Sequence, residues 1–149
     1  MSPSFQLSCL DAALSIAQAA GRVLAEGAFR RHDAESKSAT TDLVTRYDRA
    51  AEEVIVAAIR SRFPDHRILA EESGAHGSDD GAPRWIIDPL DGTTNFAHGL
   101  PLFSVSIACE WEGKVRVGVV SAPALGWTFS ASLEQDRKST RLNSSHRTV

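Results

Sequence analysis

Apolar residues recur at intervals of three and four positions through the first part of the chain. Between residues 6 and 30 they fall at Leu10, Leu14, Ala17, Ala20, Leu24 and Ala28. This spacing collects apolar side chains on one face of an α-helix. We therefore predict an amphipathic helix over residues 6–30, followed by a polar loop over residues 31–42.

A second helical pattern begins near Thr45 and ends before Pro64. Its apolar face is formed by Ala50, Val54, Ile55, Ala58 and Ile59. Short apolar runs separated by turn residues follow, at residues 67–70, 85–87, 103–111, 115–122 and 127–131. Glu112 and Gly113 separate two of these runs as in a hairpin. Two helices followed by consecutive strands predict an α+β fold, with two N-terminal helices packed on a mainly antiparallel sheet.

Composition and charge exclude several classes of protein. The 149 residues are 42% hydrophobic and carry a formal net charge of −3, so no basic field favours nucleic acid as the main partner.

Cys9 and Cys109 lie far apart in sequence, which indicates free, buried thiols in a reducing compartment. Asp11 interrupts the first apolar segment and no Lys or Arg precedes it, so we expect a cytoplasmic protein rather than a secreted one. No apolar run approaches the length of a membrane span, so we expect no membrane partner.

The last residues differ from the rest of the chain. Residues 136–149 are polar, lack periodicity and carry four Lys/Arg against one Asp. Their DRKSTRLNSSH segment resembles the translation of a common sequencing-library adapter. We therefore expect one domain over residues 1–135 and a non-native, disordered tail over residues 136–149.

Acidic residues gather at three places in the sequence. These are Asp42 with Asp48, Glu71 with Glu72, and Asp88 with Asp91. Glu71 and Asp88 each follow a predicted strand directly, so the carboxylates converge if those strands are parallel neighbours. Asp-Pro and Asp-Gly pairs also occur in simple surface turns, which is the alternative explanation for residues 88–92.

Crowded carboxylates repel one another unless a cation lies among them. Oxygen ligands without nearby His or Cys favour Mg²⁺ over zinc. A turn through Asp88 and Asp91 could aim both carboxylates at one point, with the Leu90 carbonyl as a further ligand. Residues 92–94 could then open a helix whose N–H groups face an anion such as phosphate.

Two sequence segments carry a resemblance to a known family. LAEES (69–73) and WIIDPLDGTTNFAHGLPLFSVSIA (85–108) occur in order, after DLVTRYDRAAEE (42–53). They resemble the inositol monophosphatase family of Mg²⁺-dependent sugar phosphatases over roughly residues 8–131. The resemblance implies the N-terminal half of the family's layered α/β sandwich, in truncated form.

The resemblance also implies roles for individual residues. Glu71, Asp88 and the Leu90 carbonyl would hold one Mg²⁺, Asp88 and Asp91 a second, and Thr93 would orient the attacking water. Asp91, Gly92, Thr93 and Thr94 would contact the phosphorylated substrate, while Lys37 and Asp48 would lie near the water and an additional, weaker metal. A metal-activated water would then displace the alcohol in line, without a covalent phosphoenzyme. Asp48 has a second interpretation, because it lies three residues after Thr45 in a capping-box pattern.

The implied activity is hydrolysis of a small polyol or sugar phosphate, with inositol-1-phosphate first among the substrates. The resemblance further implies lithium sensitivity and a homodimer. The family's later Trp-Asp…Ala-Gly segment, which supplies another ligand, has no counterpart here. We therefore expect this chain to be an inactive or weakly active fragment of such an enzyme. The alternatives are a non-catalytic truncated product and a regulatory paralogue without phosphatase turnover. A haloacid dehalogenase-type site is excluded, because its two aspartates lie two residues apart rather than three, and the twelve-residue calcium-loop pattern is not met.

Overall fold

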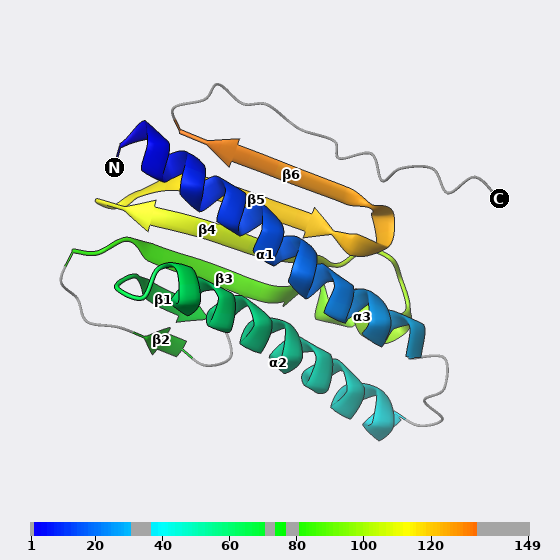
Figure 1. The fold of residues 1–149 in the computed structure, drawn as a ribbon. Coiled ribbons are helices and arrows are strands. Elements are labelled where there is room, and N and C mark those ends of the chain that lie inside the picture. Colours follow the sequence, from blue (N-terminus) through cyan, green and yellow to red (C-terminus); the bar gives the residue numbers. More distant parts are fainter. Residues whose placement is uncertain (1, 31–36, 71–73, 77–80, 134–149) are drawn as a thin grey trace.

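Two long helices cover one face of a single sheet. The computed structural model describes residues 2–30, 37–70, 74–76 and 81–133. Helix α1 spans Pro3–Arg30 and helix α2 spans Lys37–Arg62. They lie side by side, with α1 over β4 and β5 and α2 over β3 (Figure 1). The predicted pair of N-terminal helices is confirmed.

Helix α2 begins well before its predicted start. We expected the helix near Thr45, whereas its first residue is Lys37. Residues 37–44 contain no Pro or Gly, so nothing in this segment interrupts the helix. We predicted a loop there from the polar composition alone, and this prediction was wrong for residues 37–42.

In the described part of the chain, the sheet has six strands in the order β2-β1-β3-β4-β5-β6. The strands are β1 (Arg67–Ala70), β2 (Gly74–His76), β3 (Arg84–Asp91), β4 (Ser104–Trp111), β5 (Lys114–Ala122) and β6 (Trp127–Ser132). Between them lie the short helix α3 (Thr93–His98) and the 3₁₀ helix η2 (Pro123–Leu125). Only β1 and β3 pair in parallel among these strands, so the sheet is mainly antiparallel, as predicted. Strand β2 was not predicted, because three residues are too few to show alternation.

The core lies between the helices and the sheet. Ile16 and Leu24 on α1, Ile55 on α2, and Trp85 and Ile107 on the strands are buried there. The two free cysteines are also fully buried, as predicted, with Cys9 on α1 and Cys109 on β4.

The N-terminal helix is tied to the far end of the described chain. Gln6 is 2% exposed, and its side-chain amide donates to the Arg116 carbonyl at 3.2 Å and to Ser132 Oγ at 2.9 Å. These bonds join the first turns of α1 to strands β5 and β6. The first and last described elements are therefore neighbours in space.

Helix α1 is longer and more apolar than the sequence pattern indicated. By length and composition its segment Pro3–Ala28 could cross a membrane, contrary to our expectation that no apolar run approaches that length. Its many alanines make the segment apolar, and nearly half of its most apolar stretch is buried inside the structure. A core helix passes the same test, and the buried side of α1 packs on the sheet.

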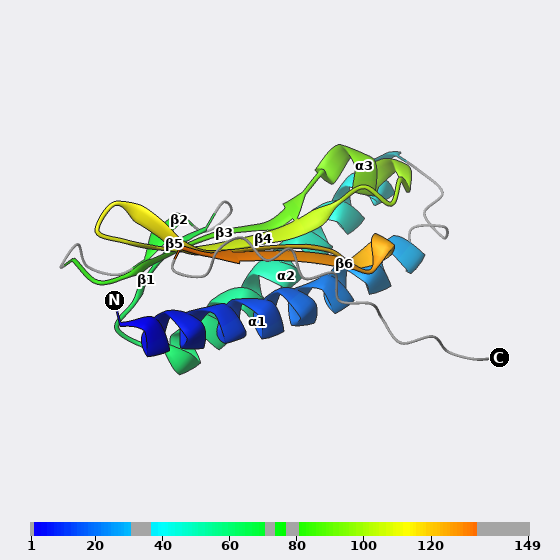
Figure 2. The ribbon, with the colours of Figure 1, turned by 90° about the horizontal axis from the view of Figure 1, so that it is seen from above.

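Among the described residues, no long helix lies over the opposite face of the sheet (Figure 2). Val120, Trp127 and Phe129 are 40%, 40% and 45% exposed. Val120 pairs with Phe129 across β5 and β6, so the two side chains share one face. We call this face, on which these three side chains lie, the open face.

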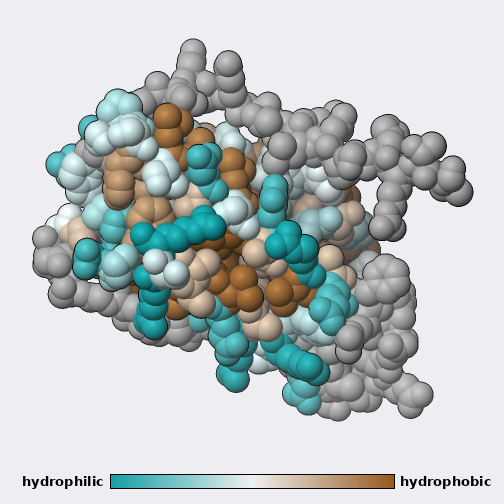
Figure 3. Space-filling view, viewed as in Figure 1, coloured by the Kyte–Doolittle hydropathy of each residue, from teal (hydrophilic) through white to brown (hydrophobic). Residues whose placement is uncertain are grey.

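The outer surface of the helices differs from the open face. Hydrophilic side chains are spread across it, with apolar patches between them (Figure 3). This is the usual pattern for amphipathic helices whose apolar faces are turned inward.

Candidate metal and phosphate site

Strands β1 and β3 are parallel neighbours, as the convergence of carboxylates requires. Their register pairs Ala70 with Ile87, the residues directly before Glu71 and Asp88 in the sequence. Glu71 and Glu72 lie outside the described residues. The strand arrangement is thus confirmed, while the position of the Glu71 carboxylate stays a prediction.

A β-bulge places Asp88 and Asp91 on the same face of the sheet. Asp88 pairs with Ser106 and Asp91 pairs with Ser104, so three steps along β3 match two steps along β4. Residues two apart in a strand point to the same face, and paired residues share a face. The extra residue in β3 therefore brings both aspartates to one side, whereas a regular strand would separate them.

This finding corrects the expected turn. We predicted that β3 would end at Ile87 and that a turn would aim the two aspartates. Instead the strand continues to Asp91. The bulge bends the strand without ending it. The bulge, and not a turn, therefore directs both aspartate side chains to one face of the sheet.

Two hydrogen bonds fix the oxygen atoms inside the bulge. The Leu90 N–H donates to Asp88 Oδ1 at 3.1 Å, and the Thr93 hydroxyl donates to the Leu90 carbonyl at 3.2 Å. The side chain of Leu90 is buried, which holds its peptide groups in place. A carbonyl oxygen has two lone pairs, so the Leu90 oxygen can still accept a cation. Thr93 therefore orients one of the predicted ligands.

Gly92 connects the bulge to helix α3. It adopts φ 86° and ψ 36°, and a Cβ atom there would lie 2.8 Å from the Leu102 carbonyl oxygen. Helix α3 begins at Thr93, and the Phe96 N–H donates to the Gly92 carbonyl at 2.9 Å. Thr93 and Thr94 are exposed in its first turn. The prediction that residues 92–94 open a helix is confirmed.

Asn95 was missed by the sequence analysis. Its side-chain amide donates to the Leu102 carbonyl at 2.8 Å, and its backbone carbonyl accepts from the Leu100 N–H at 2.9 Å. Just after it, the Phe96 ring packs edge-on against Phe103 at a centroid distance of 5.0 Å. An asparagine in a short helix gives no periodic signal, so only the structure reveals these contacts.

The remaining predicted residues lie on helix α2. Asp48 is half-buried, its Oδ1 is shielded from solvent, and it lies within the helix rather than at its start. The capping-box interpretation of Asp48 is therefore wrong. Asp42 is exposed. Lys37 is the first residue of α2, but its side chain lies outside the described residues.

The donors that the structure describes fit a hard cation. Asp88, Asp91 and the Leu90 carbonyl offer oxygen atoms only, the ligand type that Mg²⁺ prefers. Within the described ranges no three His, Cys, Asp or Glu side chains form a metal-binding group. Glu71, the further ligand that we predicted, lies outside those ranges. His98 instead contacts the Thr94 carbonyl at 2.8 Å, and His66 accepts from the Trp85 indole at 2.9 Å.

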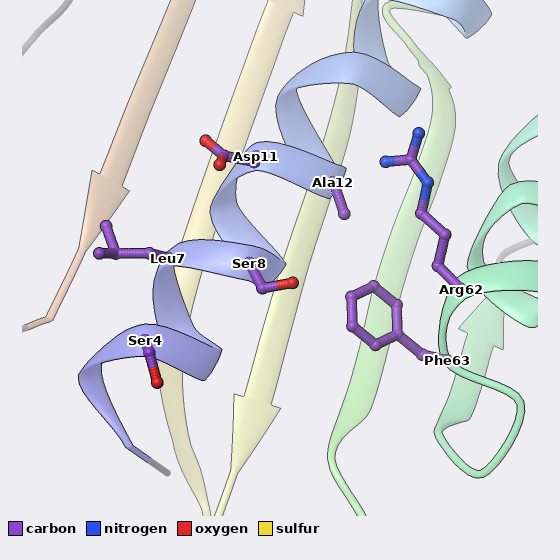
Figure 4. A pocket seen from close by; sticks show the side chains of 7 residues that line it. All are labelled: Ser4, Leu7, Ser8, Asp11, Ala12, Arg62 and Phe63. Atoms are coloured by element: carbon purple, nitrogen blue, oxygen red, sulfur yellow. The ribbon is translucent and has the colours of Figure 1, made fainter.

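A separate groove lies between the start of α1 and the end of α2 (Figure 4). It has a volume of about 510 Å³ and is lined by Ser4, Leu7, Ser8, Asp11, Ala12, Arg62 and Phe63. The Arg62 guanidinium donates to Ser15 Oγ at 2.8 Å. Phe63 packs against Trp85 near the start of β3, whereas the aspartates lie near its end. This groove is therefore distinct from the aspartate site.

A family model described as the inositol monophosphatase family matches residues 6–146. The chain is 49% identical over 123 residues to Nus factor SuhB of Pasteurella multocida, covering 82% of this chain and 46% of that protein. It is 44% identical over 122 residues to a fructose-1,6-bisphosphatase/inositol-1-monophosphatase of Thermotoga maritima, covering 82% of this chain and 46% of the relative. The chain spans about half the length of the curated relatives it matches.

Solved structures show the same fold. An inositol monophosphatase from Anabaena matches with a TM-score of 0.74 and 41% identity, over 86% of this chain and 45% of that one. The suhB protein of Bartonella henselae matches with a TM-score of 0.75 and 35% identity, over 85% and 49%. Helices on a mainly antiparallel sheet thus correspond to about half of each of these structures.

Proposed function

Because the chain belongs to the inositol monophosphatase family, we propose that it carries the metal- and phosphate-binding part of a Mg²⁺-dependent phosphomonoesterase. The β3 bulge carries this proposal: it places Asp88 and Asp91 on one face, directly before Gly92 and α3. Small polyol or sugar phosphates are the substrate class, with inositol-1-phosphate first. Relatives named fructose-1,6-bisphosphatase/inositol-1-monophosphatase and histidinol-phosphatase support the phosphatase class without choosing a substrate.

Each residue has a distinct task in this proposal. Asp88 and the Leu90 carbonyl, together with Glu71, would hold one Mg²⁺, and Asp88 with Asp91 would hold a second. When bound, these ions supply a water of lowered pKa and neutralise charge on the leaving oxygen. Thr93, whose hydroxyl already donates beside the Leu90 carbonyl, would orient that water.

The backbone would bind the phosphate. The first N–H groups of a helix have no acceptor within the helix, so those of Gly92 and Thr93 are suited to phosphate oxygens, with Thr94 beside them. Lys37 and Asp48 on α2 would lie near the water and a third, weaker metal. Helix α2 contacts both α3 and β3, the elements that carry Thr93 and the two aspartates.

Magnesium-dependent phosphate release from inositol-1-phosphate tests the proposal. The Asp88→Asn variant removes charge shared by both metals at nearly constant shape, so we expect at least a hundredfold loss of kcat/KM, about 3 kcal/mol of transition-state stabilisation. Asp65→Asn, in the turn before β1, is the matched control and should keep wild-type activity. Equal turnover of wild type and Asp88→Asn, both folded by circular dichroism, would refute the assignment.

A non-catalytic role is the second candidate. Several relatives bear the name Nus factor SuhB, which is not the name of a phosphatase, and this supports a non-catalytic product or a regulatory paralogue as the second candidate. Titration calorimetry with Mg²⁺ separates the candidates. Magnesium binding that Asp88→Asn abolishes, without phosphate release from any sugar phosphate, would favour the second.

Further properties of the whole protein belong to the proposal. We propose a cytoplasmic homodimer that lithium inhibits and that has neither nucleic acid nor membrane as its main partner. An inositol monophosphate-bound relative from the same fold supports the substrate class. Sedimentation of the purified protein would test the homodimer, and a phosphate-release assay with LiCl would test the inhibition by lithium.

A further inference from the structure

The loop between α3 and β4 lies directly against the Gly92 turn. A Cβ atom at Gly92 would lie 2.8 Å from the Leu102 carbonyl oxygen and 3.3 Å from Phe103 Cα. Gly92 also has a positive φ, which L side chains rarely adopt. The loop therefore forms one wall around the residue whose peptide groups open α3.

Asn95 holds this loop at two points. Its side-chain amide donates to the Leu102 carbonyl, and its backbone carbonyl accepts from Leu100. The Leu102 carbonyl is the same one that packs against Gly92. A single side chain thus links helix α3 to the wall of the Gly92 turn.

We propose that Asn95 is a positioning residue that clamps the Leu102 carbonyl against Gly92 and so fixes the turn that would hold the phosphate. Its catalytic consequence rests on the proposed function, whereas the clamp is a property of the fold. Asn95 acts through Gly92 and Thr93 and not on the substrate. The Phe96–Phe103 ring contact is a second, apolar link, so loss of the clamp should loosen the loop without unfolding it.

Two substitutions separate the effect of the hydrogen bond that Asn95 donates from the effect of the volume of its side chain. Asn95→Asp keeps the shape but replaces a donor with a carboxylate oxygen that faces the Leu102 carbonyl, so the two oxygens repel. Asn95→Ala removes the bond without adding repulsion and should disturb the turn less. His98→Ala is the control, because this exposed residue on the same helix contacts the Thr94 carbonyl and does not link α3 to the loop.

Amide hydrogen exchange tests the clamp without depending on enzyme activity. The amide protons of Phe96 and Leu100 bond to Gly92 and Asn95, so they report on the turn and on the loop. We expect both to exchange about tenfold faster in Asn95→Asp, the factor for loss of one hydrogen bond, and at the wild-type rate in His98→Ala. Unchanged exchange in Asn95→Asp would overturn the proposal.

Kinetics test the catalytic consequence. In Asn95→Asp, the KM for inositol-1-phosphate and the inhibition constant of inorganic phosphate should rise together, by about tenfold, while half-saturation by Mg²⁺ is unchanged. Asn95→Ala should give a smaller rise in both. A merely structural role would lower the active fraction, and hence kcat, without moving KM, and this result would also overturn the proposal. If the wild type releases no phosphate, the proposed function fails, while the exchange comparison still decides the clamp.

Discussion

At the scale of single residues, one additional position in β3 decides how the acidic pair is presented. Asp88 and Asp91 share a face only because β3 has one residue more than β4 between the two pairings. The Leu90 N–H then holds the Asp88 carboxylate from within the bulge. Without the bulge, two aspartates three residues apart in a regular strand would point to opposite faces of the sheet.

His66 illustrates a residue with a structural task. Its Nδ1 accepts from the Trp85 indole, and its ring stacks on Phe63 at a centroid distance of 4.8 Å. An imidazolium has no acceptor nitrogen, so protonation breaks the bond to Trp85. Burial lowers the pKa of His66 from its ordinary value of 6.5, against the opposing charge of Asp65.

This bond predicts a pH-dependent stability. Because the folded-state pKa of His66 lies below that of the unfolded chain, the unfolded state binds more protons below about pH 6.5. Stability is fully present above that pH and is lost as pH falls through the folded-state pKa. Urea unfolding followed by tryptophan fluorescence should show wild type losing about 1 kcal/mol more than His66→Gln between pH 7.5 and 5. Equal losses in the two proteins would contradict this account.

At the scale of elements, close approach of the two long helices depends on Gly27. A Cβ atom at Gly27 of α1 would overlap the ring of Tyr47 on α2, which is 6% exposed. The neighbouring helical glycine, Gly21, is less tightly enclosed, since a Cβ there would lie 3.3 Å from Pro123. The two glycines share a helix but differ in the space beside them.

Replacing each glycine with alanine separates helix propensity from packing. Alanine is favoured over glycine in a helix by about 1 kcal/mol. We expect Gly27→Ala nevertheless to destabilise the protein by about 1–3 kcal/mol through overpacking against Tyr47. Gly21→Ala, with the same propensity gain, should be closer to wild type in a thermal unfolding measurement. A rise in Tm for Gly27→Ala equal to that for Gly21→Ala would show that the helices can separate without cost.

Periodicity predicted most elements and missed those without a periodic signal. The helices, β1 and the hairpin around Glu112-Gly113 follow from spacing and turn chemistry, and the turn residues have φ 52° and 69°. The start of α2 and strand β2 did not follow, because a polar helix turn and a three-residue strand resemble loops in sequence.

The sequence predicted which residue types make up the candidate site but not the backbone geometry that arranges them. Its residue types and order indicated oxygen ligands before a helix start, and α3 begins at Thr93 as expected. The bulge depends on pairing with β4, and the Asn95 bond depends on a loop that returns to α3. Both the pairing of β3 with β4 and the Asn95 bond join residues that are not neighbours in the sequence, so a local sequence pattern could not predict them.

At the scale of the whole molecule, the open face is an exposed apolar surface. A shallow hollow of about 390 Å³ lies over Ala108, Gly118 and Ala131, with Val120 and Phe129 beside it. The edge strand β6 borders this face (Figure 2). Exposed apolar patches and open strand edges both favour association between proteins.

We therefore predict that the chain self-associates through the open face. Phe129→Lys should lower the concentration-dependent increase in sedimentation coefficient, with little change in unfolding midpoint, because Phe129 is 45% exposed. Leu7→Lys is a matched control, since Leu7 is 41% exposed on α1, on the other side of the sheet. If both variants changed the concentration dependence of the sedimentation coefficient equally, the chain would not associate through the open face.

The bonds from Gln6 to Arg116 and Ser132 have a consequence during protein synthesis. A ribosome delivers α1 before the strands to which Gln6 bonds. Helix α1 can pack on α2 as soon as α2 emerges, but its bonds to β5 and β6 form only after residue 132 has left the exit tunnel. The part of the apolar side of α1 that faces the sheet therefore stays uncovered during synthesis of the strands, and a factor that shields nascent apolar segments would act there.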